Sequence, residues 1–312
     1  MTRLRPEVLA AALAVLSLGA CATAQPATPA APPPARPSLQ QQVEAAIAGF
    51  DGVVGVYAEH LATGDRAEVR ADTVFPTASV VKVLLLVGTF DAIVHSALAY
   101  DQALVYCDSL AYPGEDLTAV LRDSSTVPLS EAVMLMMTAS DNTASLWLQR
   151  LVGGAAVNEW LARRGFEHTR VNSRVPGREA DRTRLGWGQT TPREMARLVT
   201  LVRRGEAVSP GADEEMYRAM TRSYWNDEAL AALPPTVQAA PKQGAVDRSR
   251  SEVVLVNAPH GDYVSCVITK NQADTSYEAS NAGFVLLRTL SALFWAHFEP
   301  DSGWAPPAGT RY

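Results

Sequence analysis

From residue 75 to residue 87 the chain reads FPTASVVKVLLLV, a short polar turn that runs into an unbroken apolar segment. Ser79 and Lys82 lie three positions apart at the start of that segment, so on a helix they share one face. A serine becomes a nucleophile when a neighbour takes its proton, and a lysine can do this once burial or a nearby cation lowers its pKa. The stretch therefore predicts a buried helix that begins at a nucleophilic serine.

The same stretch has a purely structural interpretation as well. Lysine side chains often reach from a buried helix to its edge, and a serine three residues before a lysine is a common spacing. In favour of the catalytic interpretation, the start of a helix leaves backbone N–H groups free to bind a developing oxyanion. Ser79 and Lys82 alone do not decide between the two interpretations, so the rest of the chain must.

Composition narrows the class of protein. The chain has 312 residues, of which 47% are apolar and 19% are charged, and this suits a globular enzyme of one large or two interleaved domains. A net charge of −6 without a basic stripe argues against a nucleic-acid partner. The five histidines are scattered, and there is no His-Glu-x-x-His, Cys-x-x-Cys or glycine-rich phosphate loop, so no metal or cofactor is expected.

Residues 1–21 have the pattern of an export signal. A start with two arginines precedes an apolar segment that is too short to span a bilayer. The signal ends in Leu-Gly-Ala-Cys, which resembles a bacterial lipoprotein signal whose Cys21 is lipid-modified. Ordinary cleavage near residues 22–24 is the alternative. We expect an exported, periplasmic lipoprotein anchored to a membrane through Cys21, with Ala22 favouring the outer membrane.

The remaining chain divides into a tether and a folded domain. Residues 22–37 are rich in proline and alanine, a composition typical of an extended linker. Residues 38–312 alternate between helical and strand-like periodicity. Strands are predicted at 53–58, 66–69, 252–257 and 263–269, and helices at 130–137, 143–151, 155–164, 191–204 and 280–298. Thr191 to Glu194 read as a capping box with proline at the first helical position.

This order of elements predicts an α+β fold. Strands from both chain ends would form one antiparallel sheet flanked by helices, with an all-helical subdomain inserted. The α/β part would comprise about 38–78 and 225–312, and the helical part about 79–224.

Two further motifs follow along the chain. Ser140-Asp141-Asn142 lies at a break between helical segments, where each residue type is also a good helix cap. Lys242-Gln243-Gly244-Ala245 precedes the late hairpin and could be the exposed start of a strand.

Together with Ser79-x-x-Lys82, these motifs resemble the Ser-x-x-Lys, Ser-Asp-Asn and Lys-Thr-Gly series of class A β-lactamases and related penicillin-binding proteins. The resemblance runs from about Ser38 to the final helix. It implies a monomeric serine hydrolase without cofactor that attacks β-lactams or D-Ala-D-Ala-like peptides.

The resemblance also implies roles by position. Ser79 would be the acylated nucleophile, Lys82 its proton acceptor, and Ser140 a relay to the leaving nitrogen. The N–H groups of Ser79 and Ala245 would form the oxyanion hole.

On the substrate side, Asn142 would bind the side-chain amide. Lys242 would hold a carboxylate, with Gln243 and Gly244 beside it.

The chain departs from the family at two places. Gln243 stands where the family has threonine or serine, which puts binding of the substrate carboxylate in doubt. The Glu-x-x-Leu-Asn motif is missing, and its glutamate activates the water that releases the acyl group. Pro176 falls near that position, and Glu179 and Asp181 are the nearby substitutes, although surface ion pairs with the surrounding arginines are the simpler interpretation.

Several alternatives therefore stay open. Slow release of the acyl group would favour a D,D-carboxypeptidase or another penicillin-binding protein, and hydrolysis of simple esters would favour an esterase. A non-catalytic module that binds cell wall through the same cleft is the third alternative. Cys107 and Cys266 could form a disulfide in an exported protein, or Cys266 could be a buried apolar side chain.

Overall fold

The fold is described from a computed structural model that covers residues 37–114 and 116–307. The predicted signal at 1–21, Cys21 and nearly all of the predicted tether lie outside the described residues. Among the described residues, none of the helices has the length and hydrophobicity needed to cross a bilayer.

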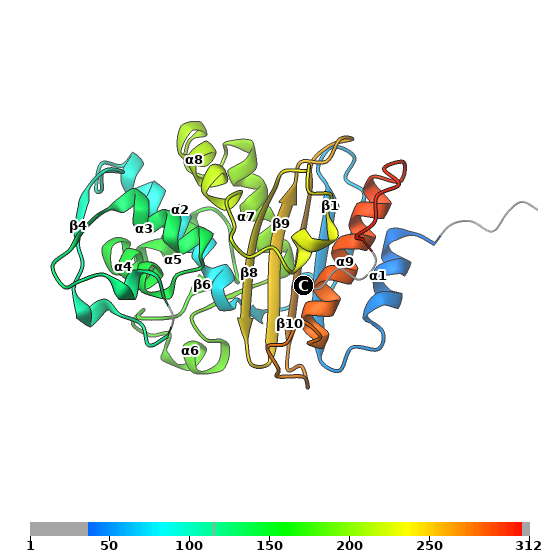
Figure 1. Cartoon of the computed structure of the whole chain (residues 1–312), viewed down its shortest axis with the longest axis horizontal. Coiled ribbons are helices and arrows are strands. Elements are labelled where there is room, and N and C mark those ends of the chain that lie inside the picture. Colours follow the sequence, from blue (N-terminus) through cyan, green and yellow to red (C-terminus); the bar gives the residue numbers. More distant parts are fainter. Residues whose placement is uncertain (1–36, 115, 308–312) are drawn as a thin grey trace, which may run out of the picture. The chain divides into compact units, whose positions relative to one another are not determined.

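A five-stranded antiparallel sheet forms the centre of the domain (Figure 1). Its strand order is β2-β1-β10-β9-β8, which places strands from both chain ends side by side. The central pairing joins β1 to β10, with Val53 opposite Lys270 and His60 opposite Tyr263. The strands are β1 (Val53–His60), β2 (Arg66–Val69), β8 (Ala239–Val246), β9 (Ser249–Val256) and β10 (Tyr263–Lys270). The predicted α+β fold is confirmed.

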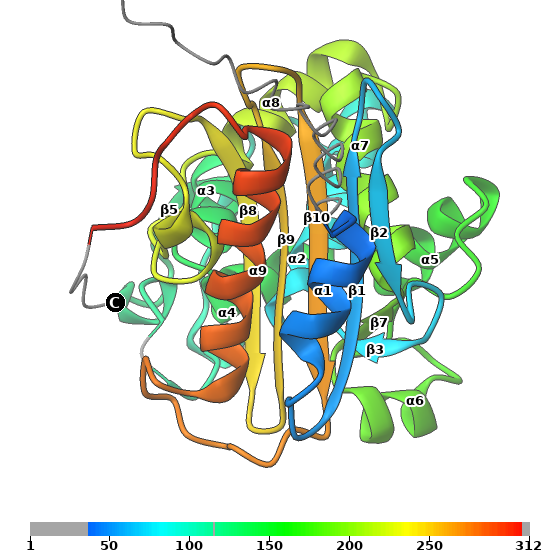
Figure 2. The ribbon, with the colours of Figure 1, turned by 90° about the vertical axis from the view of Figure 1, so that its right-hand side faces the viewer.

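Helices α1 (Leu39–Ile47) and α9 (Ala282–Phe298) cover one face of the sheet, where Figure 2 shows them side by side. Their apolar side chains, among them Leu39, Leu290 and Phe294, pack with the sheet into one hydrophobic core. This layer closes the sheet on the side away from the helical region (Figure 1).

The opposite face meets the helical region, whose centre is α2 (Val81–Val94). The first ten residues of α2 are all buried, which is expected of a helix that is apolar on every side. Around it lie α3 (Leu129–Thr138), α4 (Asn142–Val152), α5 (Gly154–Arg163), α6 (Glu179–Leu185), α7 (Pro192–Arg204) and α8 (Pro210–Met220). Their larger core is continuous with the sheet side chains that face it.

Short elements complete the domain. Strands β3 (Phe75–Pro76), β7 (Gly188–Thr190) and β6 (Arg170–Val171) form a small sheet, and β4 (Ala103–Val105) pairs with β5 (Thr126–Pro128). The 3-10 turns are η1 (Ala78–Val80), η2 (Asp108–Leu110), η3 (Thr118–Val120) and η4 (Ala229–Ala232).

The predicted capping box of α7 forms only in part. Thr191 caps the helix by accepting from the N–H of Glu194, and Pro192 opens it. The Glu194 carboxylate does not return to Thr191 but accepts from the backbone N–H groups of Glu167, His168 and Thr169. The glutamate therefore holds a neighbouring loop against the helix start, because three backbone N–H groups of that loop point at its carboxylate.

Cys107 and Cys266 are both free thiols. Cys266 is fully buried in β10, and burial raises the pKa of its thiol, so it is an apolar packing residue.

Candidate active site

Ser79 lies in η1, the tight turn that leads into α2. Ala78 before it has a φ of 45°, a strained conformation for a residue with a side chain. Strand β8 passes so close that a Cβ on Gly244 would lie 2.7 Å from the Ser79 nitrogen and 2.8 Å from the Thr77 oxygen. Glycine is therefore required at position 244 to bring the strand against the turn.

Lys82 lies one turn further, with its side chain fully buried. Its Nζ is 3.0 Å from Ser79 Oγ, 2.8 Å from Asn142 Oδ1, 3.1 Å from Ser140 Oγ and 2.5 Å from the Ser140 carbonyl oxygen. Four acceptors exceed the three hydrogens of an ammonium. A neutral amine could donate to the two nearest, the Ser140 carbonyl and Asn142 Oδ1, and keep its lone pair for the Ser79 hydroxyl.

Electrostatics favour that neutral amine. Burial lowers the pKa of Lys82 well below its usual value, and the nearby Lys242 cation lowers it further. The carboxylates of Asp116 and Asp141 act against this depression. Lys82 is thus better suited to accept a proton than an exposed lysine is.

Ser140 is held at the junction of α3 and α4, where its φ of 59° turns the chain sharply. Asp141 caps α4 through the N–H of Ala144 at 2.7 Å, and its second oxygen accepts from the N–H of Thr118 at 2.7 Å. Asp116 accepts from the N–H groups of Asn142 and Thr143. Two carboxylates therefore fix the start of α4 and with it the position of Ser140 and Asn142.

Lys242 approaches Ser140 from the opposite side, on edge strand β8. Its buried Nζ donates to Ser140 Oγ at 3.0 Å and to the main-chain oxygen of Gln243 at 3.0 Å. Burial lowers the pKa of Lys242 to about 7. The Gln243 side-chain oxygen also accepts from Lys242 Nζ, at 3.2 Å. Lys242 therefore donates to Gln243 as well as to Ser140.

Two glutamates near Lys242 were not identified from the sequence. Glu252 lies directly opposite Gln243 on β9 and accepts from the N–H of Ala229 at 2.8 Å. Glu228 is 8% exposed, and its Oε2 has no hydrogen-bond partner among the described residues. Burial raises the pKa of both carboxyl groups, while both oppose the depression of the Lys242 pKa. In the sequence Glu252 only marks the start of the apolar stretch 253–256, so no spacing singled it out.

The network opens into a cleft made of two cavities of about 740 Å³ and about 510 Å³. Ser79, Asn142 and Ala245 line both cavities, so the nucleophile lies where they meet. Every site residue named from the sequence within the α/β and helical parts therefore lies in or beside this cleft, with Lys82 and Lys242 buried beneath it.

The two acidic residues of the divergent loop behave differently. Glu179 opens α6 and accepts from the N–H of Gly177, whereas Asp181 forms ion pairs with Arg178 at 2.8 Å and Arg184 at 2.9 Å. Neither carboxylate lines a cavity that contains Ser79. Asp181 therefore braces the loop, as the simpler interpretation of its arginine neighbours predicted.

No cluster of three or more histidine, cysteine, aspartate or glutamate side chains suited to a metal ion occurs within 37–114 and 116–307.

Comparison with known proteins gives the family. A model described as the beta-lactamase enzyme family matches residues 38–298. A β-lactamase from Streptomyces fradiae is 27% identical over 280 residues, covering 83% of this chain and 87% of its own length. A β-lactamase from Streptomyces albus G is 26% identical over 259 residues, or 76% of this chain and 80% of its own.

Among solved structures, PBP-A superposes with a TM-score of 0.75 at 27% identity, covering 84% of this chain and 96% of its own. A single-residue mutant of PBP-A, solved as an acyl-enzyme complex with penicillin G, gives the same values. The family model spans most of the chain, and its description agrees with the class A-like fold and the three motifs. The chain belongs to the beta-lactamase enzyme family, whose members are hydrolases that act on β-lactams.

Proposed function

We propose that the protein hydrolyses β-lactams through a covalent acyl-enzyme on Ser79. The observation that carries the proposal is the buried Lys82 amine, which lies within hydrogen-bond distance of both Ser79 Oγ and Ser140 Oγ. Lys242 reaches the same Ser140 oxygen from the other side. The arrangement therefore offers a continuous route for a proton from the nucleophile to a leaving group.

Acylation begins when Lys82 takes the hydroxyl proton of Ser79. The Ser79 oxygen attacks the lactam carbonyl carbon, and negative charge develops on the carbonyl oxygen. The N–H groups of Ser79 and Ala245 would stabilise that charge, because the close approach of β8 at Gly244 brings both backbones to one side of the cleft.

The C–N bond then breaks, and the nitrogen takes the proton of the Ser140 hydroxyl. Ser140 regains a proton from the Lys82 ammonium, so the amine returns to its neutral form and the protons balance. Lys242 stabilises the transient charge on Ser140 and would bind a substrate carboxylate. Asn142 would donate from its amide nitrogen to the substrate, since its oxygen already accepts from Lys82.

Hydrolysis of the acyl-enzyme needs a base for water. Of the acidic side chains that line the cavities with Ser79, Asp116 is occupied as a cap, and burial raises the pKa of Glu228 and so disfavours its charged form. Asp227 is exposed, and its side chain shares a hydrogen bond with Glu228. Lys82 is the remaining base, and we propose that it activates the water slowly. This favours a second candidate function, a penicillin-binding peptidase in which release of a β-lactam is slow.

An intact-mass time course with benzylpenicillin tests the proposal. A mass adduct on Ser79 that forms and then clears supports hydrolysis, and an adduct that persists supports the peptidase. Ser79→Ala should form no adduct. If the unaltered protein forms no adduct and consumes no penicillin, the proposed function is wrong, and the esterase and the binding module regain weight.

We also propose that the protein is exported and lipid-anchored, with residues 1–20 removed, Cys21 kept as the lipid-modified first residue, and residues 22–37 serving as the tether of a monomeric domain. The support is the small-residue run before Cys21. Expression in a Gram-negative host with radiolabelled palmitate tests this, because the unaltered chain should be labelled and found in the membrane fraction. Cys21→Ser should be neither.

A further inference from the structure

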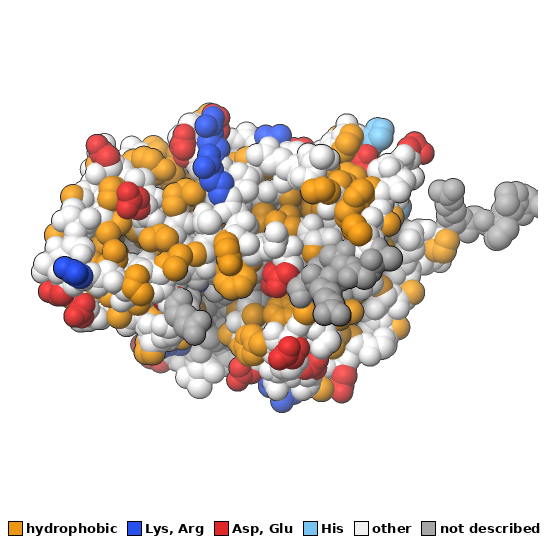
Figure 3. Space-filling view, in the orientation of Figure 1, with side chains coloured by type: hydrophobic (Ala, Val, Ile, Leu, Met, Phe, Trp, Pro, Cys, Tyr) orange, Lys and Arg blue, Asp and Glu red, His pale blue; other side chains and the backbone are white. Residues whose placement is uncertain are grey.

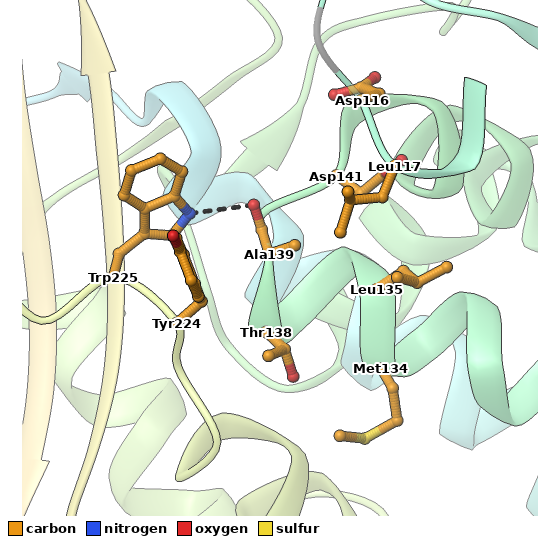
Figure 4. Close-up of a pocket in the computed structure, with 9 residues that line it drawn as sticks. All are labelled: Asp116, Leu117, Met134, Leu135, Thr138, Ala139, Asp141, Tyr224 and Trp225. Atoms are coloured by element: carbon orange, nitrogen blue, oxygen red, sulfur yellow. Dashed lines mark hydrogen bonds between the residues drawn. The ribbon is translucent and has the colours of Figure 1, made fainter. Parts of the chain in front are cut away.

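An apolar pocket of about 550 Å³ lies next to the cleft, and no step of the proposed reaction uses it (Figure 4). Met134, Leu135 and Thr138 of α3 form its floor, and Leu117, Tyr224 and Trp225 form its walls. Figure 3 shows hydrophobic side chains gathered over this part of the surface, between α3, α4 and β8. A built apolar pocket beside a nucleophile is the usual form of a small-molecule subsite.

The pocket is continuous with the nucleophile's cavity. Asp116, Ala139 and Trp225 line both spaces. Ala139 directly precedes Ser140, the residue proposed to pass a proton to the leaving nitrogen. A substituent that extends from the leaving nitrogen past Ser140 would therefore reach the pocket along the surface that Asp116, Ala139 and Trp225 give to both spaces.

The aromatic wall is exposed but held in place. Tyr224 is 71% exposed and Trp225 is 43% exposed, and their rings meet edge to face at 5.3 Å. The Tyr224 N–H donates to the Thr138 oxygen at 2.9 Å, and Trp225 Nε1 donates to the Ala139 oxygen at 2.9 Å (Figure 4). Two hydrogen bonds thus fix an apolar surface that water alone does not favour.

The pocket offers apolar contact rather than charge. Asp116 and Asp141 lie at its edge, but both oxygens of each carboxylate already accept from backbone N–H groups. We infer that this pocket is a subsite for an uncharged aromatic or apolar group carried on the leaving-nitrogen side of the substrate. The inference rests on the proposed function, because the role of Ser140 defines which side that is.

A matched pair of cephalosporins tests the subsite. Nitrocefin and cephalothin share the thienylacetamido side chain, but the leaving side carries a dinitrostyryl group in nitrocefin and an acetoxymethyl group in cephalothin. We expect Trp225→Ala to lower kcat/KM for nitrocefin about tenfold more than for cephalothin, since the styryl ring loses its aromatic contact. Comparison of each variant with the unaltered protein cancels the intrinsic reactivity of the two substrates.

Two further variants keep the test decisive if Trp225→Ala fails to fold. Leu117→Ser changes a side chain that is already 56% exposed, and it should shift the ratio in the same direction. Val105→Ser is the matched control, because Val105 is 62% exposed on β4 and lines none of the three cavities. It should leave the ratio within twofold.

The outcomes separate the two proposals. If both cephalosporins label Ser79 but the ratio stays within twofold in Trp225→Ala and Leu117→Ser, the subsite is wrong and the proposed function stands. If the ratio shifts equally in Val105→Ser, the subsite is also wrong. If neither cephalosporin labels Ser79, the proposed function fails and the subsite inference fails with it.

Discussion

The serine–lysine network and the loop at residues 172–187 border the same cleft, yet they are built in opposite ways. In the network, two fully buried lysines converge on Ser140 Oγ, at 3.1 Å for Lys82 and 3.0 Å for Lys242. In the loop, the charged side chains pair with one another near the surface, as Asp181 does with Arg178 and Arg184. Buried, hydrogen-bonded groups hold a fixed geometry, whereas surface ion pairs contribute little.

This difference separates the two halves of a hydrolytic cycle. Forming an acyl-serine needs the nucleophile, a base and a proton relay, and the network brings all three together. Releasing the acyl group needs a positioned base for water, and the loop directs none of its carboxylates into the cavities with Ser79. We therefore expect substitutions in the network to affect acylation strongly and substitutions in the loop to affect release weakly.

The largest effect is expected for Lys82→Met. Removal of the general base should lower the acylation rate by roughly 10³-fold, within the range of such catalysis. Stopped-flow measurement of nitrocefin acylation checks this. Lys82→Arg separates the base from the charge, because a guanidinium keeps the charge but cannot accept a proton at neutral pH. Substantial activity in Lys82→Arg would contradict the proton-acceptor role.

A smaller effect is expected for Asp141→Ala, which removes a cap and leaves the Thr118 N–H buried without a partner. The free energy of unfolding should fall by about 2–4 kcal/mol. Asp213→Ala is the matched control, because Asp213 is also fully buried and accepts from the N–H groups of Ala207 and Val208.

Both aspartate variants should lose similar stability in urea unfolding. Only Asp141→Ala should also lower the acylation rate of the folded protein, because Asp141 fixes the residues on both sides of it, Ser140 and Asn142. Equal acylation rates in the two variants would show that the cap does not position the catalytic serine.

A pH dependence should distinguish the two lysines. Lys82 accepts a proton only when neutral, so acylation should rise with pH through its depressed pKa. Lys242→Gln removes a nearby cation that lowers this pKa, so the pKa of Lys82 rises and the acid limb moves to higher pH. The pH profile of kcat/KM for cephalothin measures the shift. Weaker binding of the substrate carboxylate by Lys242→Gln would only reduce the height of the profile. An acid limb that stays at the same pH would contradict the electrostatic coupling between Lys242 and Lys82.

Much of this architecture could be predicted from the sequence because it follows strong periodic patterns. The hairpins of β1 with β2 and of β9 with β10, the apolar α2 and the amphipathic α9 were all recognisable. Strand β8 was harder: the sequence allows Lys242 to Ala245 to be the exposed start of a strand, whereas the strand begins at Ala239 and Lys242 is fully buried within it. Its backbone pairs fully with β9, and most of its side chains are buried because the helical region covers it.

The spatial partners of the motifs were harder to predict than the motifs themselves. Asp116, Glu228 and Glu252 lie far from Ser79 in the sequence and belong to no recognised spacing, and the fold alone brings them beside the lysines. The partners of the Glu194 carboxylate were equally hard to predict. They are three backbone N–H groups of a loop that only the fold brings to the start of α7.

The smallest effect is expected in the loop. Glu179→Gln should leave the rate of acyl release within about twofold, because the carboxylate accepts from the N–H of Gly177 and lines neither cavity with Ser79. Intact-mass decay of the benzylpenicillin adduct measures that rate. Asp181→Asn is the companion variant, since it breaks the ion pairs with Arg178 and Arg184 without altering the cleft directly.

If loosening the loop matters, Asp181→Asn should change release by a few-fold at most while Glu179→Gln changes nothing. A tenfold slowing in Glu179→Gln alone would reverse the comparison, because the loop would then supply the base for water after all. Lys82 would in that case act in acylation only, and the two sides of the cleft would each serve one half of the cycle.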